Sequence, residues 1–304
     1  MSHIHGLTVN SRLSKVAGIT SPNSRYAVPN TRFAARLGCS TISFRHQPLA
    51  RALETIASLG FAEVDLGALP GVCDHVPFVL DADAVADVAS SVVASGLRVR
   101  SVNGDVGDLN APLRGGRRSD RRAHLEMLSS LAAAIGARAL VLPCGALDHT
   151  PVATLDADVA LVADELSAAA AVAATHGVDL WTESLHLHRL CWNIERAQLL
   201  ADRLGDDVGI VMDFSHVVAS GGDPVDFVAR FGPRIAHVHI RDATPGNINV
   251  SVGNGHVDFG RGISELNAAG YGGHYALELE TRDITDDQRP EAAAKAGDVI
   301  SNLV

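Results

Sequence analysis

The sequence predicts an α/β protein with the (β/α)8 TIM barrel fold, formed by a single domain. From residue 36 onward, eight short apolar runs alternate with eight longer amphipathic stretches that are rich in alanine. Alternating strands and helices indicate a parallel sheet, and eight repeats fit a closed barrel better than an open one. No Gly-x-Gly-x-x-Gly motif follows the first predicted strand, which argues against a dinucleotide-binding fold.

The first four strand–helix units occupy roughly the first half of this region. Pro48 suits the first turn of a helix, Asp81 is a favourable N-cap, and Gly60 and Gly136 end their helices. The predicted strands are residues 36–44, 62–66, 97–102 and 139–142. The predicted helices are residues 48–58, a stretch that begins near 81, 119–135 and 155–177.

The last four units follow in the same rhythm. Asp223 and Pro224 form a capping residue followed by proline, which marks the start of a helix. The predicted strands are residues 178–182, 208–212, 234–242 and 275–279. The predicted helices are residues 193–204, a stretch that begins at 223, 263–269 and 288–303, and a glycine-rich loop follows the seventh strand.

Two regions are expected along the chain of 304 residues, an N-terminal extension over 1–35 and the barrel over 36–304. The extension is rich in serine, mildly basic and without the apolar core of a secretory signal. We expect it to be disordered alone or to lie over a partner subunit. Further copies of the chain, and a small second subunit, are the expected protein partners.

Composition excludes several classes of function. A net charge of −10 argues against a nucleic-acid binder or a protein that binds anionic membranes, because phosphate neutralisation needs clustered lysine and arginine. No run of 18 apolar residues is present, so no membrane span is expected. The four cysteines are widely separated, which is typical of reduced structural thiols in a cytoplasmic protein.

Four consecutive strands end in side chains that can bind a metal. Glu183, Asp213, His239 and Glu278 occur at comparable depth on the last four strands. A barrel of this kind has its active site at these strand ends. Three converging carboxylates would repel one another, and a divalent cation removes that repulsion. Three oxygen donors and one nitrogen favour Mn²⁺, with Mg²⁺, Co²⁺ and Zn²⁺ as alternatives.

The seventh strand carries His237, His239 and Arg241 on one face. We assign the ligand role to His239 and a deeper structural role to His237. Arg241 is a candidate for binding substrate oxygens, because its guanidinium fork suits pairs of oxygens. The alternative is a salt bridge from Arg241 to Asp242 or Glu280.

Glu280 lies on the same face as Glu278, so a register slip of two residues would exchange their roles. Two further histidines lie in loops on the same side of the barrel. His186, three residues after Glu183, and His149, in a long loop after the fourth strand, are candidate substrate-binding residues. The alternative for both histidines is a polar rim around the site.

Several motifs match those of a known superfamily. They are Glu183, the run Asp213 to His216, the run His237 to Asp242, the loop Gly253 to Phe259, and the segment Gly270 to Glu278. From about residue 36 onward the chain resembles the xylose isomerase-like TIM barrels, which include sugar isomerases, ketose 3-epimerases, inosose dehydratases and endonuclease IV. The order and strand placement of the motifs carry the resemblance.

The resemblance implies metal binding by Glu183, Asp213, His239 and Glu278. In the epimerase and isomerase branches, the two metal-bound glutamates also move the substrate proton, which implies catalytic roles for Glu183 and Glu278. His216 matches a family position that contacts substrate oxygen near the metal.

The function expected from these residues is a metal-dependent isomerase or epimerase of a sugar, sugar phosphate or cyclitol, acting through an enediolate. The alternative is a metal-dependent lyase or dehydratase on the same site, including C-glycoside cleavage as the large subunit of a two-component enzyme. A non-catalytic barrel that binds sugar or protein is a third reading. Endonuclease IV activity is disfavoured because only His75 offers an additional ligand near strands two to four.

Overall fold

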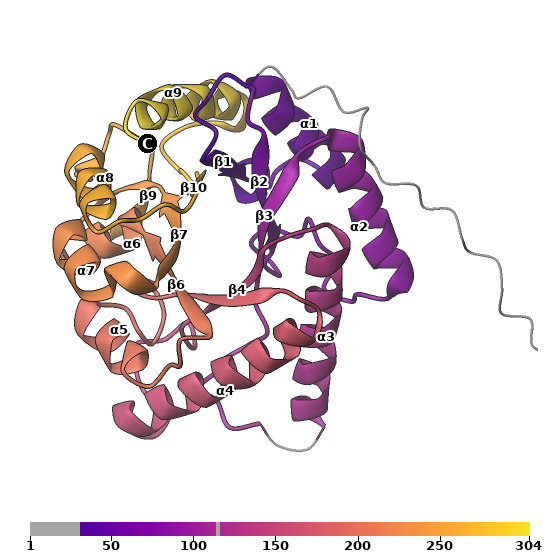
Figure 1. The fold of residues 1–304 in the computed structure, drawn as a ribbon, viewed down its shortest axis with the longest axis vertical. Helices are drawn as coiled ribbons and strands as arrows, with labels where there is room; N and C mark the ends of the chain where they lie inside the picture. Colours follow the sequence, from indigo (N-terminus) through magenta and orange to yellow (C-terminus); the bar gives the residue numbers. More distant parts are fainter. Residues whose placement is uncertain (1–30, 114–115) are drawn as a thin grey trace, which may run out of the picture.

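The computed structural model describes residues 31–113 and 116–304, and within them the chain forms a closed barrel of parallel strands surrounded by helices (Figure 1). Around the barrel the strand order is β1-β10-β7-β6-β5-β4-β3-β2. The (β/α)8 prediction is therefore confirmed.

The barrel strands lie close to their predicted positions. They are β1 (Leu37–Ser40), β2 (Glu63–Ala68), β3 (Arg98–Gly104), β4 (Ala139–Pro143), β5 (Asp179–Glu183), β6 (Val208–Asp213), β7 (Ile235–Ile240) and β10 (Tyr275–Leu277). Parallel pairing in register brings the C-terminal ends of β5, β6, β7 and β10 to one edge of the barrel.

The helices form the outer ring (Figure 1). They are α1 (Leu49–Leu59), α2 (Ala82–Ser95), α3 (Arg117–Ala134), α4 (Leu155–Thr175), α5 (Ile194–Ala201), α6 (Phe214–Ala219), α7 (Pro224–Phe231), α8 (Phe259–Ala268) and α9 (Arg289–Ser301). Short 3-10 helices cover Thr41–Phe44, Gly232–Arg234 and Asp286–Gln288. Asp81 and Asp223 cap α2 and α7 with side-chain hydrogen bonds, as their positions in the sequence predicted.

Two local predictions were wrong. The first strand does not reach residue 44, because the Ser40 side chain accepts a hydrogen bond from the Ile42 amide and starts a 3-10 helix. The helix α6, for which no prediction was made, directly follows β6. The glycine-rich loop after β7 begins as an antiparallel hairpin of β8 (Asp242–Thr244) and β9 (Asn247–Val250). Pro245 and Gly246, with Gly246 at a φ of 75°, form its turn.

The apolar core fills the layer between the barrel and the helices, and the barrel interior has a smaller core of its own. Ala139, Val141, Trp181 and Val211 form this interior cluster. Trp181 also stacks on His237, with ring centroids 5.5 Å apart. The Trp181 ring therefore packs directly against a polar side chain of the barrel interior, that of His237.

The predicted N-terminal extension lies mostly outside the described residues. Within the described part, Phe33 is buried and stacks on Phe61, with ring centroids 4.2 Å apart. The four cysteines are buried free thiols. Among the described helices, we find none with the length and hydropathy needed to span a membrane.

Candidate active site at the carboxyl edge of the barrel

The four predicted metal-binding side chains meet at the C-terminal edge of the barrel. Glu183 and Asp213 end β5 and β6, His239 lies in β7, and Glu278 follows β10. Register places His239 beside Asp213 on one side and beside Ala276 on the other, two residues before Glu278. One potential ligand atom from each residue lies within 4.8 Å of the others.

His239 lies at the centre of this group. Its Nδ1 is 2.8 Å from Oε2 of Glu278 and 3.2 Å from Oε1 of Glu183. Burial opposes the charged imidazolium, but the nearby carboxylates, Glu278 first among them, raise the pKa of His239 well above its ordinary value. Nδ1 therefore lies where negative charge is concentrated and where a cation is stabilised.

The Glu183 and Asp213 carboxyls have different surroundings, which shift their pKa values in opposite directions. Burial raises the pKa of the Glu183 carboxyl above its ordinary value, although a hydrogen bond with His239 opposes the rise, and the charge of Glu278 adds to it. Burial would also raise the pKa of Asp213, but the Arg241 guanidinium outweighs it and lowers that pKa. In the metal-free protein the Glu183 carboxyl is therefore more easily protonated than the Asp213 carboxyl.

Asp213 is held in place by the start of α6. Its Oδ1 accepts hydrogen bonds from the amide and hydroxyl of Ser215, each over 2.6 Å, and from the His216 amide. Its Oδ2 accepts one hydrogen bond from Arg241 over 2.9 Å. A carboxylate oxygen has two lone pairs, so Oδ2 can still bind a metal ion.

Arg241 makes one of its two predicted salt bridges. Its Nη1 donates to Oε2 of Glu280 over 2.7 Å, and Arg45 donates to the other oxygen of Glu280 over 2.6 Å. Both oxygens of Glu280 are thus bound to arginine, and Glu280 is not part of the group whose potential ligand atoms converge, although it lines the same cavity. This arrangement favours Glu278 over Glu280 as the ligand.

The predicted contact between Arg241 and Asp242 was wrong. The Asp242 carboxylate instead accepts hydrogen bonds from the backbone amides of Ala243, Gly253, Gly255 and Val257. Three of these amides belong to the loop after the β8–β9 hairpin, so the Asp242 carboxylate ties this loop to the end of β7.

A cavity of about 750 Å³ lies against three of the four side chains, Glu183, His239 and Glu278. Asp213 is not among its lining residues, whereas His186 and Arg241 are. Its wall includes apolar side chains from the loops after β2 and β4, and arginines from the segments after β1 and β10 and from the start of α9. They are Leu69, Pro70, Val72 and Leu147, and Arg45, Arg282 and Arg289.

Only some of the predicted substrate-binding residues line the cavity. His186 lines the cavity, with Nε2 3.9 Å from Oε2 of Glu183. His216 is fully buried and is not among the lining residues. Its Nδ1 accepts a hydrogen bond from the Leu187 amide, and its ring centroid lies 3.9 Å from that of His186. His149 also lies outside the cavity lining; its Nε2 bonds to the Leu187 carbonyl, and its ring stacks on Trp192.

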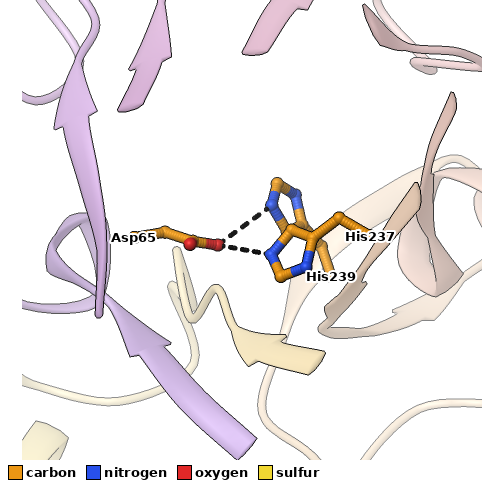
Figure 2. A group of neighbouring side chains, drawn as sticks. All are labelled: Asp65, His237 and His239. Carbon is orange, nitrogen blue, oxygen red and sulfur yellow. Dashed lines mark hydrogen bonds and ion pairs between the residues drawn. The ribbon is translucent and has the colours of Figure 1, made fainter. Parts of the chain in front are cut away.

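Sequence reasoning missed Asp65, which ends near His237 and His239 inside the barrel (Figure 2). Its Oδ2 is 2.7 Å from Nε2 of His237. Burial opposes its ionisation, but the two imidazoles, His237 first, lower the pKa of Asp65 well below its ordinary value. An acidic residue inside the apolar run of the second strand was the available signal.

Comparison with known proteins gives one match to a family model and several similar folds. The Rhizopine catabolism protein MocC of Rhizobium meliloti is 30% identical over 113 residues, which span 31% of this chain and 35% of that protein. The match thus covers about a third of that relative's length.

Solved structures resemble the whole barrel at low sequence identity. The apo form of 3-keto-D-glucoside 4-epimerase YcjR from E. coli superposes with a TM-score of 0.69 at 20% identity, covering 88% of this chain and 99% of that one. The IOLI protein with a bound zinc atom gives 0.73 at 18% identity, with the same coverage. D-psicose 3-epimerase from Clostridium cellulolyticum H10, solved with D-tagatose, gives 0.72 at 16% identity and the same coverage.

The family model that matches this chain is described as the xylose isomerase-like TIM barrel, and it covers residues 53–303. That range contains seven of the eight barrel strands and all four converging side chains at the C-terminal edge. The chain belongs to the xylose isomerase-like TIM barrel family.

Proposed function

We propose that this protein is a divalent-metal-dependent isomerase or epimerase that acts on a carbohydrate through an enediolate. The observation that carries the proposal is the convergence of Glu183, Asp213, His239 and Glu278 within 4.8 Å, with all but Asp213 lining the cavity. Membership of the family supports it, as do the epimerases and the zinc-bound protein among the similar structures.

The donor set fits a divalent cation. Three carboxylates and one imidazole provide hard oxygen ligands and one borderline nitrogen, which suits Mn²⁺ first. His239 Nδ1 faces two carboxylate oxygens at 2.8 and 3.2 Å, and negative charge at such short range favours a positive charge beside it, either a proton or a bound cation. When bound, the ion supplies Lewis-acid stabilisation of negative charge that develops on a substrate oxygen.

The protein's own residues supply the proton transfer. Glu183 and Glu278 come from different strands, with β6 and β7 between them, so their carboxylates approach the cavity base from different directions. In the proposed reaction one carboxylate removes the proton next to the substrate carbonyl, and the other returns a proton from the opposite face.

His186 and Arg241 are proposed to bind substrate oxygens, because both line the cavity beside Glu183 and Glu278. Arg241 already donates to Asp213, Glu280 and Ser215, so it would hold substrate from a fixed position. His216 and His149 remain predictions as substrate contacts, and the structure gives His216 a supporting position behind His186.

Metal content and proton exchange test the proposal together. The purified full chain should contain close to one equivalent of Mn²⁺ after loading and dialysis, and Glu183→Gln and Asp213→Asn should lose it. Incubation with a panel of ketoses and keto-sugars in D₂O should place deuterium on one carbon of a substrate without loss of a group.

Unchanged metal content in both variants would refute the metal site. Release of an aglycone or formation of an enone would replace the epimerase assignment with a lyase. The absence of both proton exchange and turnover across the panel would leave a binding protein as the better description. The predicted assembly with further copies or a small second subunit is tested separately, by light scattering of the purified chain.

A further inference from the structure

Three buried polar side chains lie together in the barrel interior. Two of them have no part in the mechanism proposed above, and the third, the proposed ligand His239, uses only one of its ring nitrogens there. Asp65 comes from β2, and His237 and His239 come from β7 (Figure 2). β1 and β10 separate these strands around the barrel, so the Asp65 contact crosses the interior instead of following the sheet. Each of the three side chains is at most 1% exposed, and a charge there needs a partner.

The two ring nitrogens of His239 face different groups. Nδ1 faces the carboxylates of Glu183 and Glu278, whereas Nε2 points back into the barrel, 3.5 Å from Oδ2 of Asp65. This distance is long for a hydrogen bond, and Nε2 has no closer partner among residues 31–113 and 116–304. Asp65 is its nearest carboxylate acceptor. A nitrogen that binds a metal carries no proton, so the proton of neutral His239 must lie on Nε2.

Asp65 is itself held in position. Its Oδ2 accepts the Nε2 proton of His237 over 2.7 Å, and the His237 ring stacks on Trp181 and lies at 89° to the ring of His239. One carboxylate oxygen has two lone pairs and can accept from both histidines. A continuous series of contacts therefore links Trp181, His237, Asp65 and His239.

The same three residues could be viewed as ligands of a second metal ion, since their nearest atoms lie within 4.8 Å of one another. One observation argues against that view. Of these three residues only His239 lines the cavity from which an ion would enter, whereas Glu183, His239 and Glu278 of the other group all line it.

We propose that Asp65 is a positioning residue that fixes the Nε2-protonated tautomer and the ring orientation of His239, and that His237 holds Asp65 for this task. The proposal rests on the proposed metal-dependent function. Partners of this kind around metal-binding histidines raise metal affinity by about 10- to 100-fold. Asp65 acts through His239 and touches neither substrate nor metal.

The test compares metal binding in three forms of the full chain. Asp65→Asn keeps the size of the side chain and removes its charge. Asp158→Asn makes the same change at another buried aspartate, which accepts hydrogen bonds from Asn110, Val152 and Ala153 and does not line the cavity. The dissociation constant for Mn²⁺, measured by titration calorimetry, and the visible absorption spectrum of the Co²⁺ form are the readouts.

We expect Asp65→Asn to raise the dissociation constant for Mn²⁺ by about 10- to 100-fold and to change the Co²⁺ spectrum. Asp158→Asn should leave both within twofold of the wild type, even where it lowers the melting temperature. Equal Mn²⁺ affinity in wild type and folded Asp65→Asn overturns this inference alone. A wild type that binds no divalent metal overturns the proposed function and this inference with it.

Two further outcomes are decisive. Binding of two metal equivalents by the wild type, with one lost in Asp65→Asn, would make Asp65 a ligand and overturn the positioning role. If Asp65→Asn does not fold, the wild type still gives an answer by ¹⁵N NMR of labelled histidines in the Zn²⁺ form. The His239 signal, assigned by its loss in His239→Asn, should show a proton on Nε2 that exchanges slowly with water, and rapid exchange refutes the hydrogen bond.

Discussion

The guanidinium of Arg241 donates from Nη2 to Oδ2 of Asp213 across 2.9 Å, and neither side chain is more than 2% exposed. This ion pair places a permanent positive charge directly beside the carboxylate cluster. Asp213 is therefore ionised before any cation binds, and its pKa lies below its ordinary value. Arg241 has a structural role that is independent of any contact with substrate.

Replacing Arg241 should destabilise the metal-free protein strongly. Arg241→Met keeps much of the volume but leaves Asp213 buried without its partner, and breaking a buried pair in this way costs about 3–5 kcal/mol of unfolding free energy. Urea unfolding of the metal-free chain measures the loss. Arg261→Met removes an exposed pair with Asp223 and should cost at most about 1 kcal/mol. Similar losses in the two variants would show that the buried pair contributes nothing special.

Glu278 and Glu280 should respond differently to metal. Glu278 is 2.8 Å from His239, whereas Glu280 is bound to Arg45 and Arg241. At a Mn²⁺ concentration of about 100 times the dissociation constant, binding should stabilise Glu280→Gln by about 2.7 kcal/mol, as in the wild type. Glu278→Gln should gain little, and thermal unfolding with and without Mn²⁺ measures both. The reverse pattern would give the ligand role to Glu280.

Asp158 should make stability depend on pH at the acidic end. Burial opposes its ionisation, but hydrogen bonds from Asn110 and two backbone amides outweigh burial and lower its pKa in the folded state. A lowered folded pKa means that the contribution is present above the unfolded pKa, about 3.9, and is lost as pH falls through the folded value.

Comparison of the wild type with Asp158→Asn isolates that contribution. Near neutral pH the wild type should be more stable by about 1.5–3 kcal/mol, the range for hydrogen bonds to charged groups. The difference should narrow as pH falls below about 4, and urea titrations at several pH values measure it. A difference that stays constant over that range would contradict the assignment.

Asp242 should control the loop that follows the hairpin. Each of its carboxylate oxygens accepts hydrogen bonds from two backbone amides. Asparagine has only one oxygen, so Asp242→Asn leaves amides without an acceptor, at about 1–3 kcal/mol for each one that stays buried. Hydrogen exchange at Gly253 and Gly255 should then accelerate. The exposed Asp226→Asn is the matched control, and equal exchange in both variants would refute the role of Asp242.

The fold and the convergence of the four strand-end side chains were predictable because they depend on local patterns and on one general rule. Eight alternating segments define the barrel, and strand ends define the side on which Glu183, Asp213, His239 and Glu278 meet. Parallel register then places neighbouring strand ends at similar depth without further information. Glu280 was separable from Glu278 only by its arginine partners, which the sequence pattern does not reveal.

Contacts across the barrel were not predictable in the same way. Asp65 meets His237 across 172 positions of sequence, and no periodicity links two strands that are not neighbours in the sheet. Asp242 was wrongly paired with Arg241, because adjacent residues on a strand point to opposite faces and the carboxylate turns toward loop amides instead. His149 was placed by loop length alone, which does not fix where a side chain points.

The pairing of β1 with β10 has a consequence for synthesis of the protein. β1 is completed at Ser40, but its partner Tyr275–Leu277 is made last among the barrel strands. At about 5–20 residues per second, the nascent chain carries an unpaired β1 edge for roughly 10–50 s after that strand leaves the ribosome. An apolar strand with a free edge invites pairing with other chains. We therefore expect the emerging polypeptide to be most prone to aggregation before β10 is made and the barrel can close.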